Sequence, residues 1–112
     1  MKCKSLTTTV AVLSTFASVF LPALARPAIK ADLAGKKICW SEGVAGTFYP
    51  NGKFVNSIQE EGTWKVAKGV QTVKLTNGAV NSGTLQFNDD KTFDYAGTWD
   101  GHPNASHGGY CN

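Results

Sequence analysis

The chain has 112 residues, with 11 Lys and Arg against 8 Asp and Glu, so its formal net charge is +3. The basic excess lies at the N-terminus, because residues 38–112 carry five lysines against seven acidic residues. Domains that bind nucleic acids show a clustered basic face on their folded part. This distribution of charge therefore excludes a nucleic-acid partner from the expected functions.

Residues 1–25 have the pattern of a secretory signal peptide. Lys2 and Lys4 precede an apolar stretch, from residue 6 to residue 21, and the segment ends in Ala-Leu-Ala. A basic start, an apolar core and a small-x-small end are typical of a cleaved signal. The alternative is an uncleaved membrane anchor, but the stretch is short for a span of about 20 residues and is interrupted by Ser and Thr. We expect cleavage after Ala25, no stable membrane span afterwards, and a secreted or periplasmic location.

Two cysteines, Cys39 and Cys111, remain after this cleavage. An even number of cysteines in an exported chain predicts a disulfide. The alternatives are two free thiols or a bond between two chains. Residues 26–37 contain Pro27 and four basic side chains, which predicts an extended basic arm before a single disulfide-tied β domain at 38–112.

Alternation of apolar and polar residues dominates the rest of the chain, and the helical period of 3.6 is absent. Ile38 and Trp40 share one face of the first candidate strand, and Leu85 and Phe87 share one face of a later strand. Asn51-Gly52 predicts a hairpin with a type I′ turn, which needs two residues of positive φ. The candidate strands and hairpins lie in residues 36–43, 46–58, 62–69, 70–78, 83–90 and 92–99, with a second Asn-Gly turn at 77–78.

About seven short strands joined by hairpins predict an all-β fold. A small antiparallel meander barrel and a compact two-sheet sandwich both fit this pattern. A Gly-Thr-apolar motif occurs four times, beginning at Gly46, Gly62, Gly83 and Gly97. We interpret it as a strand entry, in which glycine permits a bend and the apolar residue anchors the core.

The C-terminal segment, residues 100–112, contains Asp100, His102 and His107, residue types that bind zinc. However, a zinc site needs three or four ligands at a suitable spacing, and the proline and glycines here disfavour the helix that would align these two histidines. The segment also contains an Asn-Ala-Ser sequon, which is typical of an exposed loop in a secreted chain. We predict no metal and a solvated loop that delivers Cys111 to its disulfide.

No catalytic motif is present. Glu60-Glu61 and Asp89-Asp90 are adjacent acidic pairs in predicted turns, whereas a glycosidase needs two carboxylates that face each other across a cleft. Neither a serine nucleophile elbow nor a phosphate-binding glycine loop occurs. The sequence therefore predicts a protein without enzymatic activity and without a cofactor.

The aromatic residues are the main indication of function. Phe48 and Tyr49 are consecutive, so on a strand they point to opposite faces and one of them is expected outside. Phe48, Tyr49 and Trp40 are the predicted binding residues. We expect first a protein partner, for example a hydrolase to be inhibited or an envelope component. The alternative is a glycan or small-ligand-binding barrel, which a pocket lined by Trp and converging polar groups would favour. A metal protein or a small enzyme is the third possibility.

Overall fold

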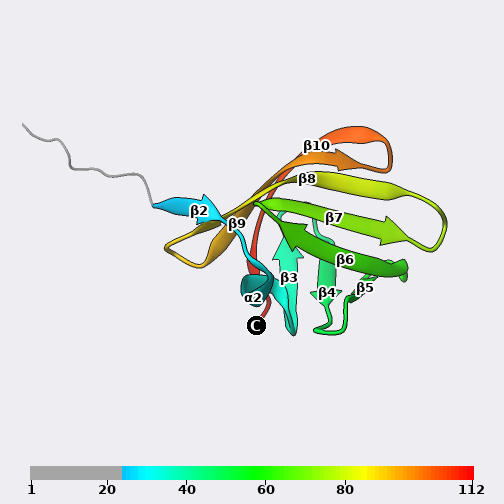
Figure 1. Ribbon diagram of the computed structural model, residues 1–112, viewed down its shortest axis with the longest axis horizontal. Coiled ribbons are helices and arrows are strands. Elements are labelled where there is room, and N and C mark those ends of the chain that lie inside the picture. Colours follow the sequence, from blue (N-terminus) through cyan, green and yellow to red (C-terminus); the bar gives the residue numbers. More distant parts are fainter. Residues whose placement is uncertain (1–23) are drawn as a thin grey trace, which may run out of the picture.

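The computed structural model describes residues 24–112, which form a closed antiparallel barrel of eight strands plus one extra strand (Figure 1). Each barrel strand pairs with the next one along the chain, and pairing between the last strand and the first closes the barrel. The barrel strands are β3 (Lys36–Trp40), β4 (Ala45–Phe48), β5 (Lys53–Asn56), β6 (Glu61–Ala67), β7 (Val70–Leu75), β8 (Val80–Asn88), β9 (Thr92–Trp99) and β10 (His102–Tyr110). The all-β meander is confirmed, as a barrel with eight strands where the sequence predicts about seven. The predicted signal peptide, apart from its last two residues, lies outside the described residues.

The barrel interior is filled by the apolar residues of the alternating pattern. The buried aromatic rings of Phe48, Phe54 and Trp64 pack together, with centroids 5.1 Å apart for the first pair and 5.3 Å for Phe48 and Trp64. The other buried hydrophobic side chains of the barrel strands are Ile38, Val73, Leu75, Leu85, Phe93 and Tyr95. Alternate residues are buried along β4, β5 and β7, which confirms that the period-2 pattern identified the core.

Two glycines of the Gly-Thr-apolar motif mark the closest approach of β8 and β9. Gly83 and Gly97 are partners in register, and a Cβ added to Gly83 would lie 2.7 Å from the Cα of Gly97. No side chain fits at that distance, so both positions require glycine. The close approach allows these two long strands to bend around the barrel axis.

The turns correct one expectation. Only Gly52 of the Asn51-Gly52 pair has positive φ, and its N–H donates to Tyr49 O at 3.0 Å. The Asn51 side chain accepts the N–H of Lys53 at 3.0 Å, so asparagine acts here as an acceptor in a type I turn followed by a left-handed glycine. The predicted type I′ turn is therefore wrong at this position.

Two pairs that the sequence analysis did not single out make the two-residue turns in which both residues have positive φ. They are Lys68-Gly69, between β6 and β7, and Asp100-Gly101, between β9 and β10. This backbone conformation is that of a type I′ hairpin.

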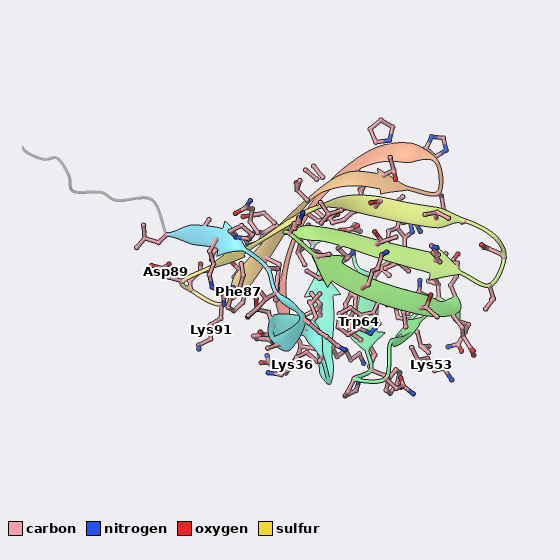
Figure 2. The ribbon with its side chains drawn as sticks, viewed as in Figure 1. Lys36, Lys53, Trp64, Phe87, Asp89 and Lys91 are labelled. Atoms are coloured by element: carbon pink, nitrogen blue, oxygen red, sulfur yellow. A yellow bond between two sulfur atoms is a disulfide. The ribbon has the colours of Figure 1, made fainter. Side chains whose placement is uncertain are left out.

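The segment predicted as an extended basic arm instead packs against one end of the barrel. It contains the last two residues of β2 (Ala25–Pro27), which pairs with β8, and the short helix α2 (Lys30–Leu33), while Lys36 and Lys37 already belong to β3. Leu33 is completely buried, and the Tyr110 hydroxyl donates to Asp32 O at 2.8 Å. Figure 2 shows Lys36, Phe87 and the β8–β9 turn toward this same end of the molecule. The buried leucine explains the correction, because an apolar side chain gains by covering the barrel end.

An ion pair holds α2 in place. Arg26 makes two hydrogen bonds of 2.9 Å to the Asp32 carboxylate, which also accepts the N–H of Ile29 at 2.9 Å. Burial raises the pKa of Asp32, but the hydrogen bonds to Arg26 and Ile29 outweigh it, so the pKa lies below its ordinary value.

The C-terminal segment is a strand, which corrects the predicted loop. β10 pairs with β9 through eight residue pairs, from His102–Trp99 to Gly109–Thr92, and its end pairs with β3. Pro103 is tolerated because only residues 108–110 of β10 pair with β3, so the first half of the strand has a free edge. Pairing along two neighbours outweighs a composition that is typical of loops.

A disulfide joins Cys39 to Cys111 with a Cα–Cα distance of 5.2 Å, as predicted. It lies where the first and last barrel strands meet, and the Cys111 N–H donates to Lys37 O at 2.9 Å. Disulfides persist in oxidising compartments, so this bond is consistent with export. Within residues 24–112, no helix has the length and hydrophobicity needed to cross a membrane.

Candidate pocket at the open end of the barrel

The two ends of the barrel differ. In an antiparallel meander, alternate loops lie at the same end, so the loops at 41–44, 57–60, 76–79 and 100–101 gather at one end. The opposite end is covered by α2 and β2. The first end, which we call the open end, therefore has no covering element among residues 24–112.

A pocket of about 270 Å³ opens into the barrel at the open end. Its volume exceeds the roughly 150 Å³ of an apolar cavity that binds benzene and is just below the usual range of ligand sites, about 300–1,000 Å³. The lining residues are Trp40, Glu42, Val44, Gly46, Phe48, Phe54, Asn56, Ile58, Gln71, Tyr95, Trp99, Asp100, Asn104 and Ser106. A substituted single ring is the size of ligand that this space can hold.

Aromatic rings form the walls of the pocket. Trp40 and Tyr95 meet edge to face with centroids 6.3 Å apart, and Phe54 and Trp99 meet in the same way at 6.4 Å. Such pairs hold each ring in one orientation. Both Trp40 and Trp99 are only partly buried, so part of each indole surface is free to contact a ligand.

Gln71 is the most buried polar residue of the lining, with 2% of its surface exposed. Its Oε1 atom is buried and has no hydrogen-bond partner in the described part of the chain. Gln71 lies on β7 in the same inward phase as Val73, where an apolar residue is the normal choice. A buried polar atom without a partner costs about 1–3 kcal/mol, so this acceptor calls for an explanation.

The register of the strands places Gln71 in a row that crosses four neighbouring strands. Gln71 pairs with Gly83, Gly83 with Gly97, and Gly97 with Asn104. The two middle positions are glycines, so no side chain stands in this row between the amides of Gln71 and Asn104. Both amides line the same pocket.

Three other polar side chains of the pocket hydrogen-bond to one another. Asn104 Nδ2 donates to Ser106 Oγ at 3.0 Å, and Ser106 Oγ donates to Glu42 Oε2 at 2.8 Å. The Tyr95 hydroxyl donates to Thr98 O at 2.9 Å, and burial raises the pKa of this phenol. These groups form a preorganised rim and differ from Gln71, whose acceptor is unused.

Asn56 has a structural role beside the pocket. Its Oδ1 accepts the N–H groups of Ile58 and Glu60, and its Nδ2 donates to Glu60 Oε1 at 2.8 Å. This buried amide therefore holds the 57–60 loop in place, and it leaves no obvious bond unmade.

The three predicted binding residues do not lie together. Trp40 and Phe48 line the pocket, where Phe48 is almost completely buried at its base. Tyr49 is 43% exposed and lies in the turn between β4 and β5, at the end of the barrel opposite the pocket mouth. Its carbonyl accepts the indole N–H of Trp64 at 2.8 Å, so its backbone supports the core while its ring faces solvent.

The residues weighed as metal ligands also lie apart. Asp100 lines the pocket mouth, while His102 and His107 are separated by an odd number of positions on β10 and so point to opposite faces. Within residues 24–112, no group of three or more His, Cys, Asp or Glu residues is arranged to hold a metal ion.

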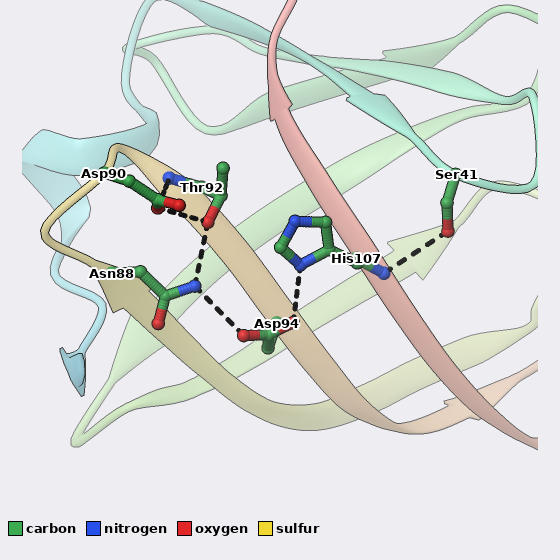
Figure 3. Close-up of polar contacts among 6 residues, drawn as sticks. All are labelled: Ser41, Asn88, Asp90, Thr92, Asp94 and His107. Carbon is green, nitrogen blue, oxygen red and sulfur yellow. Dashed lines mark hydrogen bonds and ion pairs between the residues drawn. The ribbon is translucent and has the colours of Figure 1, made fainter. Parts of the chain in front are cut away.

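His107 takes part in a polar network on the outside of the barrel (Figure 3). Its Nδ1 lies 2.7 Å from Asp94 Oδ1, and Asn88 Nδ2 donates to Asp94 Oδ2 at 3.0 Å. The hydrogen bonds from His107 and Asn88 lower the pKa of Asp94. Ser41 Oγ bonds to the backbone N–H of His107 and not to the imidazole, so the three residues do not form a nucleophilic triad.

The sequence analysis missed Gln71, Trp99, Asn104 and Ser106 as site residues. For Gln71 a signal existed, since it is a polar residue in phase with the inward-facing Val73 of its own strand. Asn104 and Ser106 were missed because the proline and glycines of their segment predicted a loop, whereas the segment is β10.

Comparisons of the chain with protein-family models, with curated proteins and with solved structures found no match. The interpretation of the pocket therefore depends on its own geometry and chemistry.

Proposed function

We propose that this protein binds a small organic ligand in the open-end pocket and does not catalyse a reaction. The observation that carries the proposal is the unpartnered, buried Oε1 of Gln71 inside an aromatic pocket. A leucine at this position would avoid the cost of an unmade hydrogen bond. A ligand with a hydrogen-bond donor would supply the missing partner of this amide oxygen, so ligand binding accounts for a glutamine at this buried position.

The composition of the lining supports the same function. Ligand pockets are mostly apolar and aromatic, with a few placed polar groups that orient the ligand. Here two tryptophans and their two aromatic pairing partners line the pocket together with a buried acceptor that has no partner and a hydrogen-bonded polar rim. A pocket lined by Trp with converging polar groups is the feature expected of a ligand-binding barrel, so it favours a ligand over a protein partner.

The acidic residues support a non-catalytic role. Glu42 and Asp100 line the pocket mouth, but both are exposed, whereas a glycosidase shelters its general acid from water. The Asp94–His107 pair lies outside the barrel, with each side chain more than half exposed. Neither arrangement encloses a reacting group.

The three indole N–H signals in a ¹H–¹⁵N correlation spectrum test the proposal directly. Trp40 and Trp99 line the pocket, whereas the Trp64 N–H is bonded to Tyr49 O away from it. A panel of single-ring and two-ring compounds, including monosaccharides, should contain members that shift the first two signals and leave the third in place. Ser106→Phe, which places a ring in the pocket, should abolish these shifts, and Tyr49→Ala should preserve them. Absence of any shift across the panel, or shifts that persist in Ser106→Phe, would contradict the proposal.

A pair of substitutions tests the role of Gln71 without a ligand. Gln71→Leu removes an unpartnered amide and should raise the free energy of unfolding by about 1 kcal/mol. Asn56→Leu removes an amide whose bonds are made and should lower it by about 1–3 kcal/mol. A loss of stability in Gln71→Leu, measured by urea denaturation, would indicate a structural role for the glutamine.

Secretion or periplasmic export is part of the proposal. The signal-like residues 1–25 and the Cys39–Cys111 bond support it. The intact mass of the protein recovered outside the cytoplasm should correspond to a chain that begins at Arg26. Recovery of the uncleaved chain in the membrane fraction would contradict the predicted cleavage.

A protein partner is the second candidate, and the exposed Tyr49 ring is the observation that favours it. Tyr49 lies in a turn that is fixed by its own backbone hydrogen bonds, and Lys53 lies beside it. A rigid exposed aromatic is a common anchor in protein interfaces. A pull-down from secreted or envelope extract, in which Tyr49→Ala loses a protein that the wild type retains, would support this candidate.

A further inference from the structure

We infer that the open-end pocket selects an organic ammonium ion with an aromatic or apolar body. The inference rests on the proposed ligand-binding function and adds the charge of the ligand. It depends on three features of the pocket: the charges around the mouth, the aromatic walls, and the buried acceptor that has no partner.

The loops of the open end carry only negative charge. The four loops at 41–44, 57–60, 76–79 and 100–101 contain Glu42, Glu60 and Asp100 and no Lys, Arg or His. Basic residues are instead common around the covered end, where Figure 2 shows Lys36 and Lys91 near β2 and α2. A cleft lined by charges of one sign concentrates ligands of the opposite sign, so this end attracts cations and repels anions.

The carboxylates belong to the pocket and not only to its surroundings. Glu42 and Asp100 are both lining residues, and none of the fourteen lining residues is basic. Glu42 is also oriented, since its Oε2 accepts the Ser106 hydroxyl at 2.8 Å. An anionic ligand would face two carboxylates with no basic side chain to compensate.

The aromatic walls fit a cation as well. The faces of Trp and Tyr rings attract ammonium groups, and Trp does so most strongly. Trp40 and Trp99 each pack edge to face against a neighbouring ring at the pocket, which keeps their orientation constant. A ligand with an ammonium group on an apolar body would therefore contact rings with both of its parts.

The hydrogen-bonding groups of the pocket also favour an ammonium ligand. Gln71 Oε1 is a buried acceptor without a partner in the described residues, and the Tyr95 and Ser106 hydroxyls already donate within the protein. A primary ammonium group has three donors and no acceptor. It can therefore donate to the free amide oxygen without displacing an existing bond, while the carboxylates at the mouth favour its positive charge.

Matched ligands test the charge preference. Three bodies (phenyl, indolyl and cyclohexyl) each carry a two-carbon chain that ends in an ammonium, a hydroxyl or a carboxylate group. Binding is measured at neutral pH from the Trp40 and Trp99 indole signals and by calorimetry, at low and at high salt. For at least one body we expect the ammonium compound to bind about tenfold or more tightly than the alcohol, and the carboxylate to bind most weakly. High salt should narrow the difference.

Charge-neutralising variants identify the source of the preference. Glu42→Gln with Asp100→Asn should weaken ammonium binding by about fivefold or more and leave alcohol binding within about twofold. Glu61→Gln with Asp89→Asn removes two acids that do not line the pocket and should change neither. Gln71→Leu should weaken the ammonium and alcohol compounds together, since both donate to the same oxygen.

The outcomes separate the two proposals. Binding of alcohols or carboxylates in the pocket as tightly as ammonium compounds would overturn the ammonium preference and leave ligand binding intact. An ammonium preference that survives Glu42→Gln with Asp100→Asn would overturn the assignment of the charge selectivity to these residues. Absence of pocket binding by any of the nine compounds would overturn the ammonium inference, and absence across the wider panel would overturn the proposed function as well.

Discussion

The disulfide between Cys39 and Cys111 should be the largest single contributor to the stability of the barrel. It joins the first barrel strand, β3, to the residue after the last strand, β10. These two strands share only three residue pairs, compared with eight between β9 and β10. The pairing that closes the barrel thus has few hydrogen bonds, and the disulfide reinforces it.

The size of the effect follows from the length of chain that the bond closes. The cysteines are 72 positions apart, and the chain-entropy relation for a loop of this length gives about 4 kcal/mol at 25 °C. For a domain of this size, 1 kcal/mol changes the melting temperature by roughly 4–8 °C. Replacing both cysteines by alanine should therefore lower the melting temperature by about 20 °C or more.

Urea denaturation of three samples measures this contribution: the oxidised protein, the reduced protein with blocked thiols, and the double variant Cys39→Ala with Cys111→Ala. The reduced protein and the double variant should lose similar free energies of unfolding. Trp40 follows Cys39 directly on β3, so loss of the bond should also weaken ligand binding at the pocket. A loss below about 1 kcal/mol with an unchanged denaturant slope would refute the entropic argument, and two reactive thiols in the purified protein would remove the disulfide itself.

Three further predictions concern single side chains. Phe48→Ala should cost about 3–5 kcal/mol because the ring is buried, whereas Tyr49→Ala should cost little because its ring is exposed in the β4–β5 turn. Equal large losses would show that the Tyr49 ring also contributes to the packing. Asp32 has a lowered pKa in the folded protein, so its stabilising effect is present above its ordinary pKa and is lost as the pH falls through the folded value. Asp32→Asn should therefore flatten the decline in the free energy of unfolding below about pH 4. The same decline in the variant and the wild type would contradict this. His102→Ala with His107→Ala should change stability by about 0.5 kcal/mol or less, and a zinc-dependent rise in wild-type melting temperature that this variant loses would reveal a metal site.

The fold could be predicted from local patterns because a barrel repeats one simple requirement along the chain. Alternate side chains of a barrel strand face inward, and the sequence pattern grouped Ile38 with Trp40 and Leu85 with Phe87 before the register was known; Ile38 and Leu85 are completely buried. The disulfide was equally predictable, since removal of the predicted signal peptide leaves two cysteines, which have one intramolecular pairing. Neither prediction needed to know which strands lie side by side.

The C-terminal strand could not be predicted from composition. Residues 102–110 include one proline and two glycines, which are typical of a loop, yet eight pairs with β9 and three with β3 hold them in a strand. Backbone hydrogen bonds to two neighbours do not depend strongly on side-chain type, so the tertiary context outweighs the local preference. The prediction failed because the strand is specified by its neighbours.

The pocket depends on register even more strongly. Phe54 and Trp99 are distant in the sequence, and only the closed barrel brings their rings together at one end. A shift of one residue in any strand would turn its inward side chains outward. A list of aromatic residues therefore identified Trp40 and Phe48 but could not separate them from Tyr49, which lies at the other end.

Polar residues at inward-facing positions of a strand are a sequence signal for binding-site residues in similar barrels. Residues 24–112 contain three buried amides of that kind, Asn56, Asn81 and Gln71, and the structure distinguishes them by their hydrogen bonds. Asn56 is bonded through both side-chain atoms and holds a loop; Asn81 accepts the N–H of Asp100 at 2.8 Å but leaves its own Nδ2 without a partner. Only Gln71 combines an unpartnered oxygen with a place in the pocket lining. Position in the strand thus finds the candidates, and the unmet hydrogen bond selects the one that a ligand would satisfy.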